Sequence, residues 1–133
     1  MEKRFRFEDL EIWKLSAEIA GKLFDIADDM DQRRLYRFTE QIRGAALSTP
    51  NNIAEGSGST SLKEFAQFLN IARRSIFENA SMLIIFGRRN LIKTSAVDEL
   101  LNPKNAVESV PSSYAGELFC SMPIHRRFLK SAR

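Results

Sequence analysis

Ser48-Thr-Pro-Asn-Asn-Ile-Ala-Glu-Gly56 is the stretch of this chain from which its fold is best worked out. It places a proline and two asparagines in the second half of a segment with helical periodicity, and it ends at a glycine. Proline inside a helix costs about 3 kcal/mol, because it removes a backbone donor and clashes with the preceding turn. Asparagine prefers caps and turns. We therefore expect packing and polar contacts to hold this stretch, and the helix to end at Gly56.

Two interpretations of the stretch are open. As a ligand site, Asn52 and Glu55 could offer an amide and a carboxylate. As a structural element, Asn52 would bind the carbonyl that Pro50 leaves without a donor, and Glu55 would pair with Arg43 or Arg73 across a helix contact. Buried polar groups need partners in either case. We favour the structural interpretation, which covers Pro50, Asn52, Glu55, Gly56, Arg43 and Arg73.

Upstream, apolar residues recur at three- and four-residue steps between positions 7 and 30, which predicts a long helix. They are Leu10, Trp13, Ala17, Ala20, Phe24, Ala27 and Met30, with Ile12, Leu15, Ile19, Leu23 and Ile26 widening the face. A face this wide indicates a central helix or one at an interface. Asp28, Asp29 and Asp31 follow, and the helix macrodipole disfavours anions at a C-terminal end. The helix is therefore expected to end near Asp28.

Two further helices are predicted around the opening stretch. One begins near Arg34, and its small residues at 44–46 permit close helix approach. The connecting loop is Gly56-Ser-Gly-Ser-Thr-Ser61, in which Ser61 and Glu64 form a capping-box pattern for the next helix. That helix runs from Leu62 to about Arg89. Trp13 and the phenylalanines at helical spacing are expected in the core or at an interface.

The chain after residue 95 has a different pattern. A helix over 96–101 is predicted to end at Asn102-Pro103, and Pro111 and Pro123 prevent a continuous helix beyond it. We predict an all-α fold, an antiparallel up-down-up-down four-helix bundle whose fourth helix is atypical or broken. Residues 1–95 would form three long helices, and residues 96–133 an irregular, partly disordered fourth-helix region.

Composition excludes several classes of protein. The 133 residues suffice for one domain with its own core, and the 44% hydrophobic and 28% charged residues are ordinary globular values. There is no apolar run long enough for a membrane span and no secretory signal at the start. The single cysteine, Cys120, cannot form an internal disulfide, which indicates the cytoplasm.

No pattern in the sequence indicates catalysis or a cofactor. Cys120 would need a base, and a proline separates it from the one histidine, His125. Scattered carboxylates and a single histidine give no metal-ligand spacing. Gly56-Ser-Gly58 lacks the lysine and the preceding strand of a phosphate-binding loop. We expect no enzyme activity, no catalytic residue, no metal and no cofactor.

Charge is distributed unevenly although the net charge is only +3. Residues 1–31 carry five Lys/Arg against nine Asp/Glu, and residues 32–95 carry ten against four. Such a chain can neutralise itself within the bundle, between subunits, or through a polyanion. Antiparallel packing would bring the start of the second helix near the end of the third. The basic residues expected at that end, candidates for nucleic-acid binding, are Arg33, Arg34, Arg37, Arg88, Arg89 and Lys93.

Four motifs in series resemble one family, the 23S rRNA-intervening sequence proteins, which are related to the accessory variability determinant proteins of diversity-generating retroelements. The motifs are Phe7-Glu-Asp-Leu-Glu-Ile-Trp13, Gln41-Ile-Arg-Gly-Ala-Ala46, Pro50-Asn-Asn-Ile-Ala-Glu-Gly56 and Lys63-Glu-Phe-Ala-Gln-Phe-Leu-Asn-Ile-Ala-Arg-Arg-Ser75. The resemblance covers roughly residues 5 to 95. It implies a left-handed up-down-up-down bundle that assembles into a homopentamer with a central channel, and no catalytic activity. For the retroelement branch it also implies nucleic-acid binding and a reverse transcriptase as partner.

Two functional hypotheses follow. In the first, the protein is a non-enzymatic, homo-oligomeric accessory factor that binds RNA or DNA phosphates without reading sequence. In the second, it is a homo-oligomeric scaffold or protein-interaction module whose charges only mediate assembly.

Overall fold

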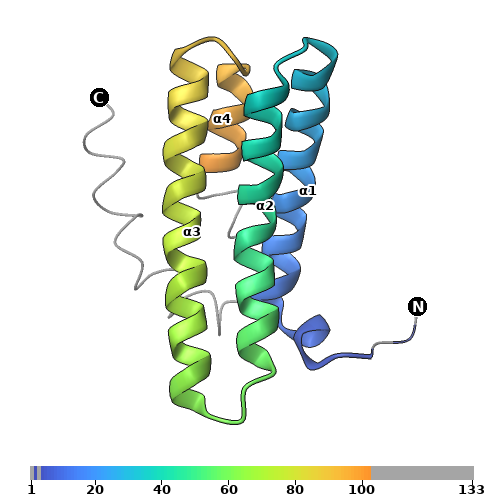
Figure 1. Ribbon diagram of the computed structural model, residues 1–133, viewed down its shortest axis with the longest axis vertical. Helices are drawn as coiled ribbons and strands as arrows, with labels where there is room; N and C mark the ends of the chain where they lie inside the picture. The colour runs from blue at the N-terminus through green and yellow to red at the C-terminus, as the bar shows by residue number, and fades with distance from the viewer. Residues whose placement is uncertain (1, 3, 103–133) are drawn as a thin grey trace. The chain divides into compact units, whose positions relative to one another are not determined.

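The computed structural model describes residue 2 and residues 4–102, and every regular element in this part is a helix (Figure 1). The short 3-10 helix η1 (Arg6–Asp9) precedes α1 (Glu11–Gln32), α2 (Tyr36–Ser57), α3 (Leu62–Arg88) and α4 (Thr94–Leu101). Consecutive long helices run antiparallel along one another, and α4 lies beside α3 and α1. The predicted all-α bundle is confirmed. Its fourth helix has only 8 residues, against 22, 22 and 27 in the other three.

The core lies between the three long helices, and α4 covers it at one end. Leu23 and Met30 of α1 pack with Ile42 of α2 and with Leu83 and Phe86 of α3. These residues are buried because the three- and four-residue spacing of each helix brings them onto one face. Across the described residues, no helix has both the length and the apolar character that crossing a membrane requires.

The C-terminal end of α1 differs from the prediction. The helix does not stop near Asp28 but continues to Gln32, so Asp28 and Asp31 lie within its last two turns. Arg43 of α2 donates hydrogen bonds to both carboxylates, at 2.6 Å to Asp28 and 2.7 Å to Asp31. This cation offsets the unfavourable interaction of the two anions with the helix macrodipole, which is why the helix can extend past them.

Helix α2 ends within one residue of the predicted end at Gly56, since it runs through Ser57 to a C-cap at Gly58. Gly56 has no positive φ. It is required instead by a close approach of α3, because a Cβ at this position would lie 2.5 Å from Phe68 Cβ and 2.9 Å from the ring of Phe65. The glycine is a packing residue between α2 and α3.

Pro50 is buried inside α2, and polar contacts surround it as expected, although with different partners. The side-chain amide of Asn52 donates to the carbonyl of Ser48 at 2.7 Å, not to the carbonyl of Ala46 that proline deprives of a donor. Two contacts join α2 to α3 nearby. Ser48 and Ser75 share a hydroxyl–hydroxyl bond of 2.6 Å, and the Asn79 amide donates to the carbonyl of Ala45 at 3.1 Å. These bonds satisfy part of the polar groups of the buried helix contact, whereas the Thr49 hydroxyl and the side-chain oxygen of Asn79 are buried without a hydrogen-bond partner among the described residues.

The expected pairing of Glu55 is not seen. Arg43 is bound to the aspartates of α1, and Glu55 and Arg73 are both exposed with no ion pair to any described residue. The predicted start of α3 at Leu62 is confirmed, and the capping box before it is confirmed in part. The Ser61 hydroxyl accepts from the Glu64 amide at 3.4 Å, whereas no bond from the Ser61 amide to the Glu64 side chain joins them. The predictions for residues 103–133, including Cys120, His125, Pro111 and Pro123, lie outside the described residues.

The first residues of the described chain pack at the end of the bundle where α2 turns into α3. The Arg6 guanidinium donates to the carbonyl of Ser57 at 3.4 Å and stands 5.9 Å from the ring centroid of Phe65. Phe7 packs against Trp13 with centroids 4.9 Å apart. The η1 segment is therefore attached to the end of α2 and the start of α3. The turns from α1 to α2 and from α3 to α4 lie at the other end of the bundle (Figure 1).

Candidate nucleic-acid interface

One end of the bundle carries both the turn from α1 to α2 and the turn from α3 to α4 (Figure 1). The two turns have the same backbone construction. After α1, the Leu35 amide donates to the Met30 carbonyl at 3.0 Å; after α3, the Leu91 amide donates to the Phe86 carbonyl at 2.9 Å. A six-to-one bond of this kind closes a helix through one residue in the left-handed region.

The left-handed residues of these turns are Arg34, with φ 59°, and Asn90, with φ 56°. Asparagine tolerates this region well because of its short polar side chain. Arginine gains no such help, and glycine would be the favoured residue there. Arg34 is thus held in a conformation that costs stability, and its side chain is exposed at the end of the bundle.

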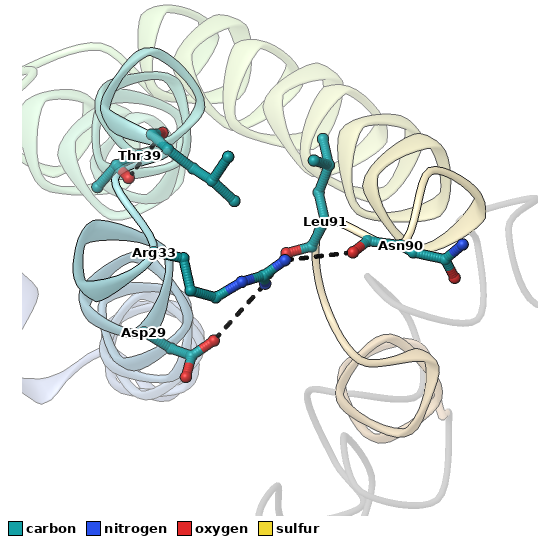
Figure 2. Close-up of polar contacts among 6 residues, drawn as sticks. Asp29, Arg33, Thr39, Asn90 and Leu91 are labelled. Atoms are coloured by element: carbon teal, nitrogen blue, oxygen red, sulfur yellow. Dashed lines mark hydrogen bonds and ion pairs between the residues drawn. The ribbon is translucent and has the colours of Figure 1, made fainter.

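Arg33 connects the two turns (Figure 2). Its guanidinium donates to the carbonyl of Leu91 and, at 3.3 Å, to the carbonyl of Asn90, and it lies 3.9 Å from a carboxylate oxygen of Asp29. Carbonyls at the end of a helix lack intrahelical donors, and a nearby cation also interacts favourably with the macrodipole. Arg33 is therefore engaged in holding the end of α3 against the end of α1.

The other five basic residues predicted at this end are exposed, and within the described part of the chain none of them forms an ion pair. They are Arg34, Arg37, Arg88, Arg89 and Lys93. Arg34 and Arg37 flank the start of α2, Arg88 and Arg89 end α3, and Lys93 precedes α4. The structure thus brings all six predicted cations to one end of the bundle. Arg33 is bound to the backbone there, whereas the other five have no ion pair to a described residue.

The carboxylates near this end are mostly occupied by other cations. Asp28 and Asp31 accept hydrogen bonds from Arg43, and these bonds, of which the one to Asp28 has the larger influence, raise the pKa of Arg43 above its ordinary value. Asp29 lies beside Arg33. Glu40, in the second turn of α2, is exposed and has no ion pair to a described residue, so that its negative charge opposes that of Arg37, three residues before it. The end of the bundle therefore keeps an excess of positive charge.

Such an arrangement can bind phosphates. Arginine presents several donors in a planar fork, which suits phosphate oxygens, and exposed cations release counterions when they neutralise a nucleic-acid backbone. Contacts of this class position a nucleic acid without reading its bases. Among the described residues there is no group of three or more His, Cys, Asp or Glu side chains able to hold a metal.

Two features of this end were missed by the sequence interpretation. The strained backbone of Arg34 depends on the closure of the turn, and the only signal for it in the sequence is a leucine directly after the basic pair, at the position of the six-to-one bond. Tyr36, the first residue of α2, is 59% exposed. Its position beside two arginines is readable in the sequence, but its exposure depends on which face of α2 is buried.

Comparison with known proteins identifies one family. The family model described as 23S rRNA-intervening sequence protein matches residues 8–112 of the chain. No curated protein and no solved structure matches the chain. The match includes helices α1 to α4 and all six predicted cations.

Proposed function

This chain belongs to the 23S rRNA-intervening sequence protein family, and from that premise we propose that it is a non-enzymatic accessory protein that binds the phosphate backbone of RNA or DNA. The binding surface is the basic end, defined as Arg34, Arg37, Arg88, Arg89 and Lys93. Binding is independent of base sequence, because the side chains involved contact phosphates.

The observation that carries this proposal is the availability of the five cations of the basic end. In a bundle that only neutralised its own charge, the aspartates of α1 would pair with these residues. Asp28 and Asp31 pair instead with Arg43, and Asp29 lies 3.9 Å from Arg33. The five cations of the basic end can therefore bind an anion that comes from outside the described part of the chain.

The backbone at Arg34 supports the same proposal. A non-glycine residue in the left-handed region costs on the order of 1 kcal/mol, and such strain is found preferentially at functional sites. Glycine at this position would relieve the strain but remove a cation from the basic end. A phosphate-binding role gives a reason for an arginine at this strained position.

Assembly would strengthen the binding. A homopentamer, as the family resemblance implies, would repeat the basic end on each subunit, and several weak phosphate contacts on one particle add up to high avidity. The resemblance to the accessory variability determinant proteins also favours a reverse transcriptase as a protein partner. Both statements belong to the proposal.

A second function, that of a homo-oligomeric scaffold without nucleic-acid binding, is favoured by apolar residues on the outer surface. Ile71, Phe77 and Ile85 of α3 are 43%, 38% and 53% exposed, and Leu47 of α2 is 43% exposed. Gly44 and Ser48 line a shallow groove of about 280 Å³ between α2 and α3, and a Cβ on Gly44 would meet nothing within 4 Å. Such a surface suits contact with another helix.

Binding to labelled RNA and DNA over a range of salt concentrations distinguishes the two functions. We expect affinity to fall steeply with salt, and to be lost when Arg34, Arg37, Arg88 and Arg89 are all replaced by alanine. Circular dichroism and sedimentation of the variant verify that its fold and assembly are retained. No binding of the wild-type protein even at low salt would contradict the proposal and leave the scaffold function.

A further inference from the structure

Tyr36 lies in the middle of the basic end and has no role in the core. It is the first residue of α2 and is 59% exposed, between Arg34, two residues before it, and Arg37, directly after it. No hydrogen bond or ring contact joins it to another residue of the described part. Its ring is therefore available to an external group.

Two of the other aromatic residues with a large exposed fraction pack against another ring. Phe38, two residues further along α2, packs edge-on against Phe86 with centroids 5.2 Å apart. Phe5 stacks on Phe7 at 5.6 Å, at the opposite end of the bundle. Phe77 of α3, 38% exposed, has no ring partner among the described residues either, and it lies one turn after Arg73 and Arg74. Tyr36 is the more exposed of these two rings, and in the sequence it stands among the cations of the basic end.

We propose that Tyr36 is a stacking platform for an unpaired base, so that the basic end binds single-stranded RNA or DNA in preference to duplex. This inference rests on the proposed function. Nucleic-acid surfaces that bind single strands combine cations that follow the backbone with aromatic rings on which bases stack. Arg34 and Arg37 are exposed cations within two residues of Tyr36 in the sequence. The phosphates that flank a base seated on Tyr36 would be the groups that these arginines bind.

A duplex cannot use this ring in the same way. Its bases are stacked on one another inside the helix, so that only phosphates and groove edges are presented, and stacking on Tyr36 would require unpairing. Duplex binding would then rely on the cations alone. Glu40 is an exposed carboxylate one turn after Tyr36, and its charge opposes phosphate on single strands and duplexes alike.

Three labelled probes with equal phosphate number test the inference: an oligothymidylate, a duplex, and a strand of abasic sugar phosphates. We expect the wild-type protein to bind the oligothymidylate about tenfold more tightly than the abasic strand or the duplex. Tyr36→Ala should weaken oligothymidylate binding about tenfold and change duplex and abasic binding less than about twofold. Tyr36→Phe, which keeps the ring, should retain the preference. Glu40→Gln should strengthen binding of all three probes.

The outcomes separate this inference from the function on which it rests. Equal binding of the three probes, with no effect of Tyr36→Ala, would overturn the stacking role and leave the phosphate-binding function standing. Absence of binding to every probe would overturn both. Sedimentation of Tyr36→Ala tests whether the ring lies at a subunit interface. If the wild-type protein is an oligomer and this variant is not, Tyr36 belongs to that interface and the inference is overturned.

Discussion

Arg33 donates a hydrogen bond to the carbonyl of Leu91, and this contact links the turn after α1 to the turn after α3. Of the six cations that gather at this end of the bundle, Arg33 is the one with backbone acceptors and a carboxylate within reach. Its position explains why a cluster that looks uniform in sequence has two roles in the structure.

Replacing Arg33 with alanine should lower the free energy of unfolding by about 1 kcal/mol, because two carbonyls in the turn after α3 lose a charged donor at a partly exposed site. Urea denaturation measures the change. Arg74→Ala is the matched control, since Arg74 is exposed in the middle of α3 without an ion pair in the described chain. Equal stability of the two variants would show that the contacts of Arg33 contribute nothing.

Arg34→Gly should have opposite effects on stability and binding. Glycine adopts the φ of 59° without strain, so we expect the variant to gain about 0.5–1 kcal/mol of stability. Its affinity for nucleic acid should fall, because one cation of the basic end is gone. Thermal unfolding and anisotropy titration measure the two quantities. A variant that is stabilised but binds as tightly as the wild type would remove Arg34 from the binding surface.

Two glycines of α2 provide a matched pair for the packing of the bundle. Gly56→Ala should destabilise the protein by about 1–3 kcal/mol, because its methyl group would overlap Phe68 and Phe65 of α3. Gly44→Ala should stabilise it by about 0.5–1 kcal/mol, because the added methyl group meets no neighbour and alanine favours the helix. Similar changes in the two variants, measured by urea denaturation, would contradict the close contact at Gly56.

The helices themselves were largely predictable from the sequence. Ser61 and Glu64 marked the start of α3, and the spacing of apolar residues identified the buried faces of α1, α2 and α3. These signals are local, since caps and periodicity depend on residues within one or two turns. The gathering of the cations at one end also followed, because short connections force neighbouring helices to be antiparallel.

The errors came from contacts between helices. Gly56 resembled a helix stop because a glycine often ends a helix, but the residue that requires it, Phe68, is on another helix. Asp28 and Asp31 looked unfavourable inside α1 until Arg43 of α2 supplied the opposing charge. The difference between Arg33 and Arg34 likewise depends on where the turn after α3 lies. In each case the deciding partner lies on another element, more than two helical turns away in the sequence, so that local sequence patterns could not predict the contact.

The salt dependence of nucleic-acid binding by two double variants of α3 tests the central claim most directly. Arg88→Ala/Arg89→Ala removes a pair of cations from the basic end, and Arg73→Ala/Arg74→Ala removes an equally exposed pair about 21 Å away along the same helix. For duplex DNA, the slope of log affinity against log salt should become shallower by about 1.8 in the first variant and stay at the wild-type value in the second. Equal slopes for the two variants would contradict a binding surface at the end of the bundle.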